Sequence, residues 1–87
     1  MGFGRNPHVA KAEAAEAKAQ DAKDQASEVR AYMEAAHLWE RAAGKESDGK
    51  RRNLYEANAE AARERSDAAA QKPAQVLSDV VERKKLV

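Results

Sequence analysis

The sequence predicts an all-α protein: an antiparallel helical hairpin with a long, alanine-rich first helix, a short third helix and coiled-coil-like packing. Three observations predict this fold. Alanine, the best helix former, occurs 21 times in 87 residues. Small apolar residues recur at alternating spacings of three and four, the heptad pattern of a helix that packs along another helix. Glycine and proline, which interrupt helices, occupy only six positions, 4 glycines and 2 prolines.

The first helix is predicted over residues 7–43, after a flexible arm at 1–6. Asn6 can cap the first backbone amides, and Pro7 suits the first helical position. Neither glycine nor proline follows until Gly44. One face of this helix forms an apolar seam, which we expect to pack against another helix. The seam consists of Ala12, Ala15, Ala19, Ala22, Ala26, Val29, Met33 and Ala36.

The second helix is predicted from about residue 50 to 71, so that residues 7–72 form the hairpin. A polar turn over residues 44–49 precedes it, with Ser47 or Asp48 as the cap. Because the turn is short, the two helices are expected to be antiparallel neighbours. The cleanest apolar stripe of this helix consists of Tyr55, Ala59, Ala62, Ser66 and Ala69.

Residues 73–87 are predicted to form a short third helix, at about 74–85, and a C-terminal tail. Pro73 interrupts the second helix. Two arrangements remain open, because the third helix can continue along the hairpin or fold back to make a three-helix bundle. A second stripe on the first helix also needs a cover, from a fold-back or from a second copy. This stripe consists of Ala31, Ala35, Leu38 and Ala42.

Trp39 is expected at the centre of the core, with Tyr32, Met33, Leu54 and Tyr55 around it. The alternative is an anchor in a partner interface, where tryptophan is enriched. The candidate interaction and core residues are Tyr32, Leu38, Trp39, Leu54 and Tyr55. Since large apolar residues are few, a monomer has a thin core, which favours self-association.

Composition argues against several classes of protein. The formal net charge is +1 although 36% of the residues are charged, so both signs are interspersed and no strong field results. This balance disfavours a dedicated nucleic-acid binder. The chain has no cysteine, which fits a reducing, cytoplasmic location, and no apolar run long enough to span a membrane.

No constellation of catalytic or ligand-binding residues is recognised. His8 and His37 lack the spacing of a metal motif, and the glycines form no phosphate-binding loop. We therefore expect that the protein is not an enzyme and that it binds neither a metal nor a cofactor. The densest basic run, Lys50, Arg51 and Arg52, is a candidate phosphate-binding site at the turn. Aromatic residues do not alternate with these cations, so a solvated turn is the favoured interpretation.

The segment from Tyr32 to Ala43 is similar to the second helix of a tetratricopeptide repeat. Tyr32, Ala35, Trp39 and Ala42 match the family pattern, and residues 53–59 are loosely similar to a first helix. No break before Tyr32 separates a first helix of the same repeat. The segment is about as similar to the helical hairpins of microtubule-interacting-and-trafficking domains. Both resemblances, confined to residues 32–65, imply a helical-hairpin interaction module.

A different resemblance covers residues 11–21. The run Lys-Ala-Glu-Ala-Ala-Glu-Ala-Lys-Ala-Gln-Asp is similar to the eleven-residue units of group 3 late-embryogenesis-abundant proteins. It implies a stress-protective helix former.

The predicted function is a small, non-enzymatic module for protein–protein interaction or assembly. Its predicted partners are other proteins, including a second copy bound through the apolar seam. The alternatives are weak nucleic-acid binding through Lys50–Arg52 and a stress-protective helix.

Overall fold

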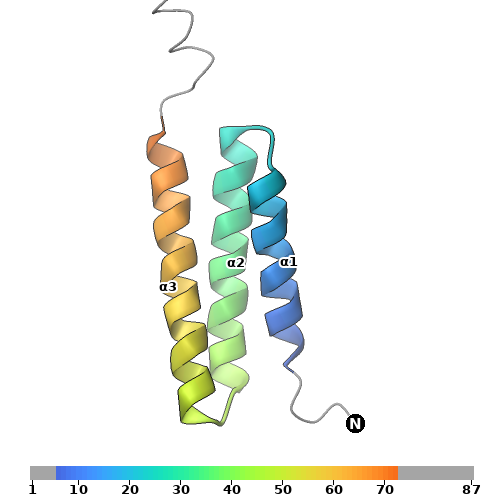
Figure 1. The fold of residues 1–87 in the computed structure, drawn as a ribbon, viewed down its shortest axis with the longest axis vertical. Helices are drawn as coiled ribbons and strands as arrows, with labels where there is room; N and C mark the ends of the chain where they lie inside the picture. Colours follow the sequence, from blue (N-terminus) through green and yellow to red (C-terminus); the bar gives the residue numbers. More distant parts are fainter. Residues whose placement is uncertain (1–5, 73–87) are drawn as a thin grey trace, which may run out of the picture.

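The computed structural model describes residues 6–72, which form three antiparallel helices (Figure 1). They are α1 (Pro7–Asp21), α2 (Gln25–Lys45) and α3 (Gly49–Gln71). α2 is the middle helix, and both α1 and α3 pack along it while making little contact with each other. The predicted all-α fold and the antiparallel hairpin of α2 and α3 are confirmed. The predicted third helix at 74–85 lies outside the described residues.

The long first helix is corrected to two helices, because the chain reverses at residues 22–24. Ala22 and Asp24 both have extended backbone conformations, and the side chain of Asp24 caps α2 by accepting a hydrogen bond from the Ser27 amide at 3.3 Å. Folding back lays the alanines of α1 against α2, where Ala12 and Ala19 are buried. A straight helix would leave that face in water, so tertiary burial outweighs the helix propensity of the linker.

The other helix ends follow the sequence signals closely. Asn6 caps α1 by accepting from the His8 amide at 3.1 Å, with Pro7 at the first helical position. Asp48 caps α3 by accepting from the Arg51 amide at 2.9 Å. α2 continues one residue past Gly44, and Glu46 ends it in an extended conformation. The turn is therefore shorter than the predicted 44–49.

The core is built around Trp39, which is 4% exposed. Its ring stacks on Tyr55 of α3, with centroids 5.6 Å apart and planes inclined by 29°. Its indole Nε1 donates a hydrogen bond to Glu16 Oε2 of α1 at 2.8 Å. All three helices therefore meet at this side chain. The residues around it are mostly alanines, including Ala12, Ala35, Ala42 and Ala62, each 0% exposed.

Two amide side chains join helix ends. Asn6 Nδ2 donates to the carbonyl of Ala42 at 2.8 Å, so the start of α1 is bonded to the last turn of α2. Gln25 Nε2 donates to the carbonyls of Ala69 and Lys72, both at 2.8 Å, and to that of Ala70 at 3.1 Å. The start of α2 is thereby bonded to the end of α3. These bonds satisfy carbonyls that a helix terminus leaves without intrahelical partners.

Candidate interaction surface

The predicted seam is divided by the break between α1 and α2. Its members on α1, Ala12, Ala15 and Ala19, are buried against α2. On α2, Ala36 is buried but Ala26 is exposed and Val29 is half-buried. Met33 is 48% exposed, and Ala22 in the linker is half-buried. The continuous seam is therefore corrected to a buried half on α1 and a partly uncovered half on α2.

The reason is that α2 turns a different face toward α1. Its second stripe, predicted to need a cover, is the face that α1 covers: Ala31 clusters with Ala19, and Ala35 with Ala12 and Ala15. Leu38 is half-buried against the same core. The seam positions of α2 consequently point toward α3 and toward solvent. We call Ala26, Val29 and Met33 the α2 strip.

The predicted core residues divide in the same way. Tyr32 is 8% exposed and Trp39 is buried, as expected for core residues, and Tyr55 is half-buried beneath the stacked indole. Leu54, in contrast, is 55% exposed on α3. Met33 and Leu54 therefore do not belong to the core around Trp39, and they are the exposed large apolar side chains of the described chain.

The α2 strip lies beside α3. Ser66 of α3 donates its hydroxyl to the carbonyl of Val29 at 3.2 Å, so the buried Ser66 is level with the middle of the strip. Two turns beyond Met33, Glu40 pairs with Arg63 of α3 and lies 3.7 Å from His37 Nδ1. Because residues seven apart on a helix share a face, Met33 and Glu40 border the same side of the α2–α3 pair.

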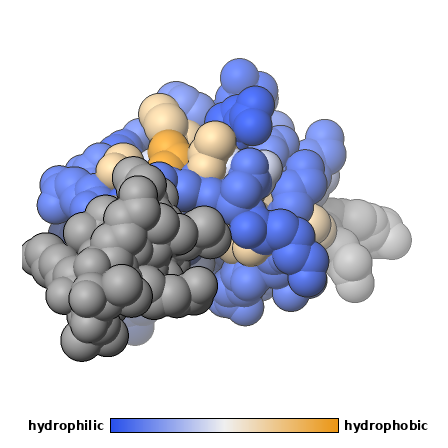
Figure 2. Space-filling model, turned by 90° about the horizontal axis from the view of Figure 1, so that it is seen from above, coloured by the Kyte–Doolittle hydropathy of each residue, from blue (hydrophilic) through white to orange (hydrophobic). Residues whose placement is uncertain are grey.

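Figure 2 looks along the helices onto the end where α2 begins and α3 ends. Hydrophilic residues make up most of the coloured surface in this view, and apolar residues show as small groups between them. The apolar residues are therefore not gathered into one broad patch on the visible part of this end.

Acidic side chains lie beside part of the basic run Lys50–Arg52, which follows the turn between α2 and α3. Arg51 Nε donates to Glu46 Oε2 at 3.1 Å, and this hydrogen bond is the main cause that raises the pKa of the Arg51 guanidinium. Arg52 lines a shallow hollow together with Glu40 and Glu56. Lys50 is exposed. Two of the three cations, Arg51 and Arg52, thus have acidic residues beside them.

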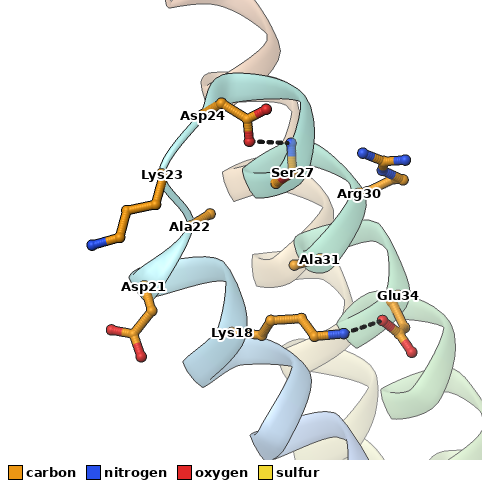
Figure 3. Close-up of a pocket in the computed structure, with 9 residues that line it drawn as sticks. All are labelled: Lys18, Asp21, Ala22, Lys23, Asp24, Ser27, Arg30, Ala31 and Glu34. Atoms are coloured by element: carbon orange, nitrogen blue, oxygen red, sulfur yellow. Dashed lines mark hydrogen bonds and ion pairs between the residues drawn. The ribbon is translucent and has the colours of Figure 1, made fainter.

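A hollow of about 680 Å³ lies between the end of α1 and the first turns of α2 (Figure 3). Lys18 Nζ and Glu34 Oε1 approach to 4.0 Å across it. Hydrogen bonding to Ser27 lowers the pKa of the capping Asp24 carboxyl. Lys23 and Arg30 point to opposite sides of the hollow (Figure 3). With both signs of charge facing water, the hollow offers no concentrated field.

Across residues 6–72, histidine and acidic side chains form no cluster of three or more that could hold a metal ion. The helices of this same region include none that is long and apolar enough to cross a membrane. Comparison of the chain with protein-family models, with curated proteins and with solved structures finds no match.

Three features were not anticipated from the sequence. Glu16 and Trp39 are 23 residues apart, and Gln25 is 44 residues from Ala69, so no local pattern connects either pair. The exposure of the α2 half of the seam could not be predicted either, because the break at residues 22–24 decides which face of α2 is not covered by α1 or α3. Asp24, followed by Glu28 in the first turn of α2, was the one local signal of that break.

Proposed function

We propose that this protein is a non-enzymatic helical module that binds other proteins, a second copy first among them, through the α2 strip. The observation that carries the proposal is the exposure of Met33, at 48%, in line with the half-buried Val29 and the exposed Ala26. The three positions share one face of α2, so they present a narrow apolar line that a second helix can cover.

The order of the helices also supports an interaction module. The break at residues 22–24 gives the segment from Tyr32 onward an antiparallel helix before it as well as one after it. A tetratricopeptide-like pair of helices needs such a boundary before its second helix, which in the resemblance is the segment that begins at Tyr32. Trp39, Tyr32 and Ala35 then serve as the packing residues between the helices.

Self-association through so small a surface is weak. Covering Met33 and Val29 contributes at most about 1.5–3 kcal/mol for each side chain. Association of two free molecules costs an estimated 4–15 kcal/mol of translational and rotational freedom. We therefore expect assembly only at high protein concentration, or with a partner that adds contacts beyond the strip.

Light scattering on a sizing column tests this proposal. We expect the mass of the wild-type chain to rise with concentration and that of Met33→Glu to remain monomeric, because the strip then carries a charge. Leu54→Glu is the matched control, since Leu54 is 55% exposed and lies outside the strip. Identical masses for the wild type and Met33→Glu, or an equal effect of Leu54→Glu, would refute the proposal.

A further inference from the structure

The α2 strip begins beside the point where the described chain ends. Gln25 Nε2 donates to the Lys72 carbonyl at 2.8 Å, and Lys72 Nζ lies 3.2 Å from Glu28 Oε1. Gln25 directly precedes Ala26, the first residue of the strip. The chain that follows Lys72 therefore starts next to an uncovered apolar surface of the same molecule.

That following chain, residues 73–87, has the sequence of an amphipathic helix after Pro73. Val76, Leu77, Val80 and Val81 are spaced so that they share one helical face, and Asp79 and Glu82 fall on the opposite one. Arg83, Lys84 and Lys85 follow.

We propose that the C-terminal segment 74–85 docks on the α2 strip of its own chain, running back antiparallel to α3. A segment of the same chain loses only the freedom of a short loop, whereas a second molecule loses its translational and rotational freedom. The same small apolar surface that binds a free partner weakly can therefore hold a tethered segment.

The register of the two helices agrees with this docking. Ser66, six residues before Lys72, bonds to the carbonyl of Val29. Two antiparallel helices that diverge from Lys72 rise equally per residue, so residue 78 is level with Ser66 and with Val29. The apolar residues at 76–81 thus lie on both sides of Val29, between the levels of Ala26 and Met33.

The same register brings residues of opposite charge to one level. Arg83, Lys84 and Lys85 are eleven to thirteen residues beyond Lys72, which places them level with Glu60 of α3. Glu56 and Glu64 are one turn away on either side of Glu60, and all three are exposed. Glu56 lines the same hollow as Glu40, which borders the face that carries Met33. These three exposed glutamates therefore lie on α3 at and near the level where the basic end of the segment arrives.

If the α2 strip binds other proteins, as proposed above, docking of the segment 74–85 also regulates that binding. A segment that covers Val29 and Met33 competes with any other protein for the same residues. The C-terminal segment then restrains assembly, and a partner has to displace it.

Crosslinking of the full chain tests the docking, since the protein has no cysteine of its own. A short bifunctional maleimide is added, at low protein concentration, to the double variant that carries Met33→Cys and Val81→Cys. The matched control is Lys18→Cys/Val81→Cys, because Lys18 pairs with Glu34 and so is level with Met33 on another face. We expect intramolecular linkage of the 33/81 pair at least about tenfold faster than of the control. Equal rates, or linkage between two chains, would overturn the proposal.

A charge exchange tests the register. We expect Glu60→Lys to slow the 33/81 linkage and the added change Lys84→Glu to restore it. A double variant as slow as the single one would overturn this pairing.

Light scattering of Val80→Glu, together with the linkage rates, then separates the docking proposal from the proposed function. If the 33/81 pair is linked preferentially but no variant assembles, the docking proposal stands and the proposed function is refuted. If assembly depends on Met33 but the 33/81 pair is not linked preferentially, the proposed function stands and the docking proposal is refuted.

Discussion

The indole nitrogen of Trp39 on α2 donates its hydrogen to a carboxylate oxygen of Glu16 on α1, at 2.8 Å. This is a polar contact at the centre of an otherwise alanine-lined interface, since Ala12 and Ala15 provide the neighbouring surface of α1. Alanine contacts bury little area, and a donor inside them must have a partner. Glu16 therefore fixes how α1 lies on α2.

Replacement of Glu16 by alanine is the direct test. We expect Glu16→Ala to lower the free energy of unfolding by about 1–3 kcal/mol, because the buried indole N–H loses its acceptor. Urea denaturation followed by far-ultraviolet circular dichroism measures this difference. Glu13→Ala on the exposed face of the same helix should change stability by less than about 0.5 kcal/mol. Equal losses in the two variants would contradict the role of Glu16.

The close approach of α1 and α2 predicts intolerance of larger side chains. Ala15 is 5% exposed and faces α2, whereas the adjacent Ala14 is exposed. We expect Ala15→Leu to cost about 1–3 kcal/mol through overpacking, and Ala14→Leu to be nearly neutral. Thermal melts of the two variants compare them at equal helix propensity and equal added volume. A stabilising effect of Ala15→Leu would show that the interface holds unfilled space.

The cap at Asp24 predicts a dependence of stability on pH. The folded-state pKa of Asp24 is lowered below 3.8, chiefly by hydrogen bonding to Ser27. Its stabilising contribution is therefore complete above the unfolded-state pKa and is lost as the pH falls through the folded-state value. We expect Asp24→Ala to have a lower urea midpoint than wild type at neutral pH, with the gap closing as the pH falls through the folded-state pKa of Asp24. A gap that persists unchanged in acid would argue against the ionised cap.

Gln25 is expected to hold the last turn of α3. Gln25→Ala removes the donor shared by the carbonyls of Ala69, Ala70 and Lys72, so that turn should fray. We expect a loss of about 0.5–1.5 kcal/mol. Amide hydrogen exchange measures it locally, as faster exchange at Gln71 and Lys72. Gln20→Ala, at an exposed position on α1, serves as the control and should leave those amides unchanged.

Much of the helical framework followed from local signals in the sequence. Asn6 and Pro7 marked the first helix start, and Asp48 was one of two caps expected for the helix after the turn. The stripe on α3 was confirmed because Ala59, Ala62, Ser66 and Ala69 are buried, and Tyr55, one turn before Ala59, is half-buried. Periodicity predicts such faces well when one helix has one covered side.

The middle helix shows where this reasoning fails. The linker Ala22-Lys23-Asp24 contains neither glycine nor proline, and the heptad spacing runs through it without interruption. Only the second stripe, with Ala31 and Ala35, indicated that α2 needs a cover on another face. Local propensity cannot reveal that the cover is the preceding part of the same chain, because that depends on the area buried after the chain reverses.

The position of Trp39 gives the protein a built-in optical probe. It is the single tryptophan of the chain, bonded at its nitrogen to α1 and stacked on Tyr55 of α3. Separation of either outer helix would let water reach the indole and shift its emission to longer wavelengths. Loss of α1 breaks the hydrogen bond and loss of α3 removes the stacked ring, so the two events change fluorescence for different reasons. One unlabelled chromophore thus reports on both helix interfaces in a single titration.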